Sequence, residues 1–454
     1  MGAPAFGAVP GENGLGRHLR RTLALAWPMM LARVGIVTMH TMDVIVLGRA
    51  GAGPLSDYVL GQAIQDSLIA MVFGLMMGVP VLVARETGAG NDLAAAAIWR
   101  RGLVFAGATG LAITAVLQLA PSLFLLTGQD AAIAARAGAV ARVLAFSMPF
   151  VAIFYVSAAF LEALQRPMVG LVAILLGNVL NLGLNVVLVF GAGPLPALGA
   201  RGCALATVIT FALLALLLLL YLRFLLPERR RYGIGLGAAG RTPPVAEQTR
   251  IGLASGGSYL FEASAFTVMT ILVGWLGTLA LAAHGVLFQF LALIFMIAAG
   301  LAGATQVRVG NAWGRGDPAG VAMAGWVGLG LASLFTGAAA LAVALAPGFF
   351  LGIFTSDPAV VAGAAPVLVW VLLATLFDGG QAVMNHACRG RGDTWVPTTL
   401  HFGSYWLVMV PGAWLLAFPA GQGLAGIYQG ILVASVVSIL VLSLRFRRLS
   451  RRAP

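Results

Sequence analysis

The feature that most constrains this chain is a series of twelve apolar stretches, each long enough to cross a lipid bilayer. A hydrocarbon core about 30 Å thick requires about 20 helical residues per crossing. The chain is 60% hydrophobic and 9% charged, whereas a soluble domain carries about 25% charged residues, so lipid must be the solvent for much of its surface. The predicted spans are residues 22–48, 57–84, 97–120, 134–163, 168–191, 197–224, 250–275, 280–307, 320–346, 360–388, 395–418 and 423–445.

The spans form two halves that repeat one another. Gly74 and Gly88, near the end of the second span, correspond to Gly300 and Gly314 in the second half. Gly300 follows Gly74, and Gly314 follows Gly88, by the same number of residues, which we call the repeat offset. A weak repeat with a constant offset indicates an internal duplication. Six spans return the chain to its starting side, so both copies enter the membrane from that side. We therefore expect an all-α membrane protein with twelve transmembrane helices as two parallel six-helix repeats around a central cleft.

The positions of the basic residues predict the orientation of the spans. All 27 basic residues are Arg, and when alternate loops are assigned to opposite sides, one side collects 22 of them and the other only Arg49, Arg136 and Arg201. Basic loops stay in the cytoplasm, so both termini are predicted to be cytoplasmic, in a multi-pass protein of a bacterial inner membrane. The expected parts are a cytoplasmic N-terminal leader (1–21), an N-terminal six-helix half (22–224), a flexible cytoplasmic linker (225–249), a C-terminal six-helix half (250–445) and a basic cytoplasmic tail (446–454).

Composition also excludes several classes of function. The formal charge of +12 comes from loop arginines between apolar runs, which membrane topology explains, so no nucleic-acid partner is expected. The chain contains no Lys, which excludes a Walker-type phosphate loop and a lysine Schiff base. The five His residues show no metal-binding spacing. We therefore expect no enzyme activity and no cofactor.

Four carboxylates lie inside predicted spans, where charge is costly. Asp43, Asp66, Glu262 and Asp378 each stand in an apolar run, and a charge at the centre of a span costs about 2.5–3.5 kcal/mol on insertion scales. Each is therefore a candidate functional residue, and the alternative is a structural hydrogen bond or a water-filled vestibule. Counted at about 1.5 Å per residue from the inner ends of their spans, Glu262 and Asp378 reach the same depth in the second half. Two carboxylates at one depth share a proton or a cation, so this pair is the candidate coupling site and the candidate Na⁺ site.

The remaining candidates surround these acids. Asp43 lies near the outer end of the first span, whose Pro28 gives that helix a place to bend, and Asp66 lies in the outer part of the second. Away from the ends of the spans, the only basic residues within them are Arg33 and Arg142, and whether they pair with the acids stays open. If all six groups are ionised and reach the cleft, it carries a charge of −2, which favours a cationic substrate. The candidate substrate contacts are Asp66, Asn181, Asn185, Tyr259, Phe266, Phe288 and Gln289.

Several short motifs, in order along the chain, resemble those of the multidrug and toxic compound extrusion (MATE) transporters. The resemblance covers roughly residues 20–445 and includes a first-span Asp at Asp43. The matching segments are Trp27-Pro28, Gly74 to Gly90, Asn181-Leu-Gly-Leu-Asn185, Leu198-Gly199-Ala-Arg-Gly202, Leu281-Ala282-Ala283-His284, and Arg308-Val309-Gly310-Asn311 to Gly316-Asp317.

The resemblance implies a secondary active antiporter that exports cationic amphipathic drugs or metabolites in exchange for Na⁺ or H⁺ by alternating access. Glu262 with Asp378 looks like the NorM-type branch, in which these positions are implicated in cation coupling. Asn185 stands where the branch without the seventh-span acid has Asp, and Gly285 stands where members often have a polar residue. The implied partners are small organic cations and the lipid bilayer, and the expected state is a monomer. The alternatives are a lipid-linked oligosaccharide flippase of the same broad superfamily and a channel or sensor.

Overall fold

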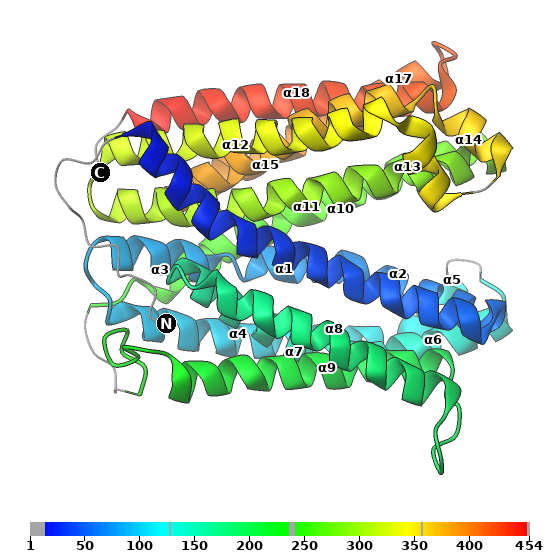
Figure 1. Cartoon of the computed structure of the whole chain (residues 1–454), viewed down its shortest axis with the longest axis horizontal. Coiled ribbons are helices and arrows are strands. Elements are labelled where there is room, and N and C mark those ends of the chain that lie inside the picture. Colours follow the sequence, from blue (N-terminus) through cyan, green and yellow to red (C-terminus); the bar gives the residue numbers. More distant parts are fainter. Residues whose placement is uncertain (1–13, 127–128, 236–240, 356, 452–454) are drawn as a thin grey trace.

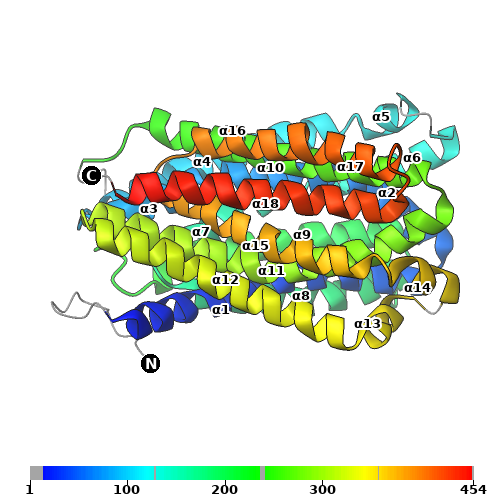
Figure 2. The ribbon, with the colours of Figure 1, turned by 90° about the horizontal axis from the view of Figure 1, so that it is seen from above.

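The computed structural model describes residues 14–126, 129–235, 241–355 and 357–451. Within these ranges long helices run side by side as one bundle, and the described chain starts and finishes at the same end of it (Figures 1 and 2). The described elements are α1 (Leu15–Ala50), α2 (Ala52–Leu75), α3 (Gly78–Gly88), α4 (Ala94–Leu117), α5 (Ala120–Leu126), α6 (Ala131–Ala145), α7 (Met148–Ala163), α8 (Pro167–Phe190), α9 (Ala200–Leu220), η1 (Tyr221–Leu225), α10 (Val245–Trp275), α11 (Thr278–Gly314), α12 (Pro318–Leu345), α13 (Pro347–Phe354), α14 (Pro358–Ala364), α15 (Leu368–Gly390), α16 (Trp395–Phe402), η2 (Gly403–Met409), α17 (Val410–Ala417) and α18 (Gly423–Ser450), where η1 and η2 are π-helices.

The described helices provide the predicted number of membrane crossings. Eleven are long and apolar enough to span a membrane, and the bent pair α6 and α7, which meet at 42°, makes twelve. The helices α1 and α10 begin, and α18 finishes, at one end of the bundle, which we call the arginine-rich end. We call the other one the opposite end. The all-α architecture expected from the sequence is confirmed.

In three of the predicted spans, a break or a change of helix type has a proline beyond it. Pro80 lies four residues after Met76, where α2 gives way to α3, and Pro149 lies four residues after Ala145, the last residue of α6. Proline has no N–H and its ring collides with the carbonyl four residues earlier, so it kinks or breaks a helix near that point. Pro411 likewise follows the π-helix η2. By contrast, α1 continues through Pro28 as one helix.

Several predicted boundaries differ from those of the structure. The helix α1 begins at Leu15, inside the predicted leader, and α18 runs to Ser450, inside the predicted tail. The remainder of those two segments, residues 1–13 and 452–454, lies outside the described residues. The predicted tenth span, 360–388, corresponds to α15 together with most of the short helix α14. Asp357 caps the N-terminus of α14, because its carboxylate accepts a hydrogen bond from the Ala359 N–H.

The described part of the linker between the halves packs against the first half. Arg231 donates a 2.7 Å hydrogen bond to Asp92, and the carbonyl of Tyr232 accepts one of 3.0 Å from the N–H of Ala96. Hydrogen bonds to Asp92 and Glu228 raise the pKa of the Arg231 guanidinium. Tyr232 and Ile234 are buried. Apolar burial and ion pairing thus fix this part of the linker to the first half, while residues 236–240 lie outside the described residues.

Glycines at repeat-related positions bring the two halves into close contact. A Cβ on Gly88 would collide with the backbone of Asn311, and a Cβ on Gly314 would collide with the backbone of Arg85. Gly314 follows Gly88 by the repeat offset, and Asn311 follows Arg85 by the same offset. The two contacts are therefore copies of one another across a pseudo-twofold axis, as a parallel repeat requires.

A second pair of contacts has the same relation. Gly74 packs against Gly256, while Gly300 packs against Met30, and the repeat offset again relates Gly74 to Gly300 and Met30 to Gly256. Small residues at helix interfaces let the backbones of membrane helices approach closely. These four contacts form what we call the glycine seam, which joins the halves at the arginine-rich end.

The hydrophobic cores show where the halves separate. One core cluster contains residues of both halves from the arginine-rich end, such as Leu25 and Val83 with Val309. Toward the opposite end each half has a core of its own, around Tyr58 in the first half and around Tyr428 in the second. The two halves therefore share one core at the arginine-rich end and have separate cores toward the opposite end.

A valine at Gly88 tests whether the glycine seam holds the halves together. Its side chain would collide with Asn311, and overpacking of this kind costs about 1–3 kcal/mol, so the closed arginine-rich end should become less populated. Spin labels at the exposed residues Leu93 and Ala319, one on each half, should show a longer mean distance than in the parent. Gly107→Val is the matched control, because a Cβ there meets no atom within 4 Å. An unchanged distance distribution in Gly88→Val would contradict the prediction.

Candidate functional site

The first half holds a buried carboxylate cluster centred on Asp43 of α1. Asp43 accepts hydrogen bonds from the hydroxyl of Tyr58 on α2 (2.9 Å), from the amide of Asn185 on α8 (2.6 Å) and from the hydroxyl of Thr207 on α9 (3.4 Å). The Asn185 amide also donates to the side-chain oxygen of Asn181, one turn away, at 2.9 Å. All five side chains are buried. Four helices thus surround one carboxylate with uncharged hydrogen-bond partners.

Two polar atoms of the cluster have no hydrogen-bond partner. The amide nitrogen of Asn181 and the side-chain oxygen of Asn185 are buried and have no hydrogen-bond partner. Buried polar atoms of this kind are costly unless a water or an ion occupies the site. Both residues were assigned to the substrate cleft from the sequence, but the structure buries them beside Asp43, where a drug-sized molecule has no access.

The second half holds a comparable cluster centred on Asp378 of α15. Asp378 accepts hydrogen bonds from Tyr405 on η2 (2.8 Å), from Gln381 one turn further along α15 (3.3 Å) and from Ser435 on α18 (3.4 Å). The π-helix places the Tyr405 hydroxyl beside this carboxylate. Asp378, Tyr405, Gln381 and Ser435 are all buried. The carboxylate is again surrounded by neutral donors.

Glu262 of α10 lies at a small cavity next to the Asp378 cluster. The cavity has a volume of ≈ 20 Å³ and is lined by Glu262, Gln381, Asn385, Arg389 and His401, among others. The side-chain oxygens of Gln381 and Asn385 are buried without a partner. The carboxylate of Glu262 lies 3.9 Å from Nε2 of His401. Gln381 therefore connects the cavity at Glu262 to Asp378, and the structure brings the predicted pair together.

The oxygen atoms of this region fit a hard cation such as Na⁺. Glu262, Gln381 and Asn385 line the cavity, the side-chain oxygens of Gln381 and Asn385 have no hydrogen-bond partner, and hard cations prefer oxygen ligands. A space this small has room for a water molecule or a small ion only. In the described part of the chain, no group of three or more His, Cys, Asp and Glu side chains is arranged to hold a metal, so amide oxygens have to supply ligands.

Arg389 corrects the assignment of basic residues made from the sequence, which counted it with a loop. It lies in the last turn of α15, is 1% exposed and lines the cavity beside Glu262. Its guanidinium carbon lies 5.3 Å from the centre of the Tyr259 ring. Glu262, Asp378 and Arg389, when all are ionised, sum to −1.

Arg33 has a partner that the sequence analysis did not identify. Its Nη2 lies 3.3 Å from both carboxylate oxygens of Glu162 on α7, and the pair is nearly buried. Arg142 instead donates a 2.9 Å hydrogen bond to the backbone carbonyl of Gln118. The predicted cleft charge of −2 is therefore wrong, because Glu162 neutralises Arg33, Arg142 contacts none of the acids, and Arg389 joins the site.

The remaining candidates lie in three different environments. Tyr259 packs edge-on against Phe73 of the other half and lies 3.2 Å from Nε2 of His386. Phe266 contacts both Phe288 and Tyr405, with ring centres 5.9 Å apart in each pair. Two candidates are exposed, Gln289 on α11 and Asp66 on α2, and Asp66 accepts a 3.1 Å hydrogen bond from Gln62.

The chain matches a known family twice. A model of the family described as MatE matches residues 28–187 and again residues 254–415. The chain belongs to the MatE family. The first residues of the two matches are separated by the repeat offset, so each half of this MatE protein is one copy of the family unit.

Curated relatives extend the match over the whole MatE chain. It is 39% identical to a probable multidrug resistance protein NorM of Caulobacter vibrioides, over 95% of this chain and 91% of that protein. It is 33% identical to a probable multidrug resistance protein NorM of Rhizobium meliloti, over 97% of this chain and 96% of that protein. The expected resemblance to NorM-type proteins is confirmed, and the chain is a multi-pass membrane transporter.

Solved structures show the same fold. A eukaryotic MATE transporter superposes with a TM-score of 0.87 and 22% identity, covering 97% of this chain and 98% of its own. An outward-facing multidrug resistance MATE family transporter superposes equally well, at 21% identity, covering 96% of this chain and 97% of its own. These likenesses confirm the two-repeat helical architecture of the MatE chain.

The pair of Arg33 and Glu162 in this MatE protein allows a test of buried charge. Arg33→Met leaves the Glu162 carboxylate buried without a partner, and breaking a buried pair costs about 3–5 kcal/mol, so the melting temperature in detergent should fall strongly. The double variant with Glu162→Gln should recover most of the loss. Arg136→Met is the control, because that residue pairs with Asp57 at 56% exposure and such pairs contribute about 0–1 kcal/mol. A double variant as unstable as Arg33→Met would contradict the pairing.

Proposed function

We propose that this MatE protein is a secondary antiporter that exports cationic amphipathic drugs or metabolites in exchange for Na⁺ or H⁺. One observation carries the proposal. Each half holds a buried carboxylate, Asp43 or Asp378, that is hydrogen-bonded by a tyrosine and an amide, and neither takes part in an ion pair among the contacts of the described residues. The relatives named NorM support drug export as the direction of transport.

The chemistry of such carboxylates supports the choice of coupling ion. An ionised carboxylate without a counter-charge is unstable in a low-dielectric interior, so it takes up a proton or binds a cation. The unsatisfied amide oxygens of Asn185 in one half, and of Gln381 and Asn385 in the other, are suitable further ligands for Na⁺. Asp43, Glu262 and Asp378 are thus the proposed coupling residues, and Na⁺ or H⁺ is a transported substrate.

The exchange itself follows from shared charge. The region of Glu262, Asp378 and Arg389 has a net charge of −1 when ionised, so it attracts one positive charge, whether ion or drug. A drug is too large for the ≈ 20 Å³ cavity and would instead contact the adjoining aromatic rings of Tyr259 and Phe266. Binding of either cation weakens binding of the other, which prevents both from being carried in the same direction.

Rocking of the halves would then move the site between the two sides of the membrane. If the arginine-rich end is cytoplasmic, as the basic loops favour, the halves share their common core on the cytoplasmic side and have separate cores toward the outside. Opening the other side requires the glycine seam to separate. Pro28 lies directly before Met29 and Met30, which pack against Gly303 and Gly300, so a bend of α1 there would act on the seam. We further propose that the protein acts as a monomer in a bacterial inner membrane, with both termini cytoplasmic and without catalysing a reaction.

The flippase alternative requires a positive cavity for an anionic pyrophosphate. The structure gives it little support, because Arg33 is paired with Glu162 and Arg389 lies beside Glu262. The central basic side chains are therefore accompanied by carboxylates.

Neutralising the coupling carboxylates should stop efflux. Glu262→Gln or Asp378→Asn should lower gradient-driven export of an ethidium-like dye to background in vesicles, tested separately with Na⁺ and proton gradients, while expression is unchanged. Asp43→Asn should impair transport but reduce dye binding less, because Asp43 lies in the other half. Asp357→Asn is the control, since this exposed residue only caps α14 and Asn caps as well as Asp. Near-normal export by either Glu262→Gln or Asp378→Asn would remove that residue from the coupling step.

Binding of cationic dye should depend on Na⁺ and pH. Raising Na⁺ or lowering pH should weaken binding competitively, because Na⁺ or protons then occupy the carboxylates that attract the dye. Titration of purified protein over a range of both conditions measures this, and the Glu262→Asp variant should keep the dependence because it keeps the charge. Affinity independent of both conditions, or tighter binding of anionic dyes, would reject the shared site and favour the flippase.

A further inference from the structure

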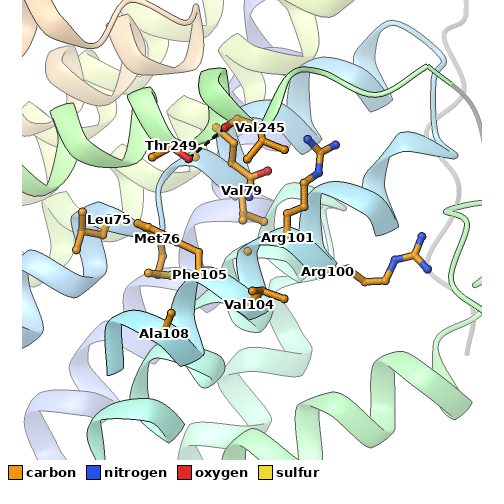
Figure 3. Close-up of a pocket in the computed structure, with 13 residues that line it drawn as sticks. Leu75, Met76, Val79, Arg100, Arg101, Val104, Phe105, Ala108, Val245 and Thr249 are labelled. Atoms are coloured by element: carbon orange, nitrogen blue, oxygen red, sulfur yellow. Dashed lines mark hydrogen bonds between the residues drawn. The ribbon is translucent and has the colours of Figure 1, made fainter. Parts of the chain in front are cut away.

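A cavity of ≈ 440 Å³ lies apart from both carboxylate clusters (Figure 3). Its volume falls in the range of small-molecule binding sites, about 300–1,000 Å³. One wall is formed by α2, α3 and α4 of the first half, including Leu75, Val79 and Phe105, and the other by the first turns of α10, including Val245. Apolar side chains form most of its lining.

The cavity faces the surface that lipid covers. Val104 and Val245 in its lining are 74% and 59% exposed, and Val104 lies within the membrane-spanning helix α4, whose exposed apolar residues face acyl chains. The polar side chain of Gln248 in its lining is anchored, because its amide donates a 3.1 Å hydrogen bond to the Ile98 carbonyl. Residues 101–108 of α4 rise about 10 Å along the helix. The cavity is therefore an apolar groove that follows α4 into the membrane.

Two arginines complete the lining, and no carboxylate does. They are Arg100 and Arg101 of α4, and both guanidinium groups extend to the same side of the apolar residues in Figure 3. Arg101 is held in place, since it donates a 2.7 Å hydrogen bond to the carbonyl of Pro243 and one of 3.3 Å to that of Ala97. An organic cation would find no counter-charge here, so the groove is unsuited to the transported drug. Basic residues at a membrane surface bind the head groups of anionic lipids.

We propose that this groove binds one anionic phospholipid, with an acyl chain between α4 and α10 and the head group at Arg100 and Arg101. The two walls belong to different halves and touch directly, since a Cβ on Gly78 would collide with the carbonyl of Gln248. The lipid therefore contacts both halves at the arginine-rich end. Because a ligand stabilises the state that it binds better, the lipid favours the conformation in which this end is closed.

Native mass spectrometry of the purified full chain, with phosphatidylglycerol and phosphatidylcholine of identical acyl chains, tests the proposal. One phosphatidylglycerol per chain should be retained at least fivefold more tightly than phosphatidylcholine. Ala108→Trp fills the groove and should abolish this retention, whereas Ala112→Trp, one turn further along the exposed face of α4, should leave it intact. Arg100→Gln should weaken retention about fivefold, the effect of one basic residue at a membrane surface. Arg448→Gln, an exposed arginine of α18, should have no effect.

Three results would overturn the proposal. Equal retention of the two lipids would show that the arginines do not select a charged head group. Undiminished phosphatidylglycerol binding by Ala108→Trp, with a melting temperature equal to that of Ala112→Trp, would place the lipid elsewhere. Displacement of phosphatidylglycerol by millimolar inorganic phosphate would identify a site for soluble anions. The readouts are independent of dye export, so failure of the antiport proposal would leave this one standing.

Discussion

The close approach of the two halves at the glycine seam determines how the rest of the molecule is arranged. Where Gly88 and Gly314 allow backbones to touch, residues of both halves merge into one hydrophobic core. Helices held together at one end and diverging at the other must form separate cores there. This divergence leaves each half with a buried carboxylate of its own. A side chain larger than hydrogen at the glycine seam would push the two halves apart, because packed interiors have little room to adjust.

The two halves share a backbone plan but place their charges differently. Arg33 pairs with Glu162, whereas its counterpart at the repeat offset is Tyr259, which faces the guanidinium of Arg389. Asp43 has Met269 at the corresponding position. Each buried carboxylate is nevertheless satisfied in the same way, by a tyrosine hydroxyl and a side-chain amide. In both clusters neutral donors stabilise a buried carboxylate, but the residues that do so stand at positions that the repeat offset does not relate.

The sequence predicts the spans and the repeat well, because lipid demands long apolar runs and duplication leaves a constant offset. The breaks at Met76 and Ala145 were also encoded, since a proline follows four residues after each. The predicted pair of Glu262 and Asp378 lies in one region, where Gln381 lines the cavity at Glu262 and donates to Asp378, because depth along a helix can be counted. Glu162 and Arg389 were missed since both lie at the ends of predicted spans, where charged residues usually reach water. Their partners are far away in the chain, so only the tertiary fold identifies them.

The glycine seam has the form of an interface between two identical subunits. In a twofold dimer, residue i of one subunit contacts residue j of the other, and j of the first contacts i of the second. Gly88 with Asn311 and Arg85 with Gly314 follow this rule within a single chain. In a homodimer the two subunits have one sequence, so equivalent positions on the two sides of the interface must carry the same residue. Fusion of the two copies removes that obligation, which is why one position can be arginine in the first half and asparagine in the second.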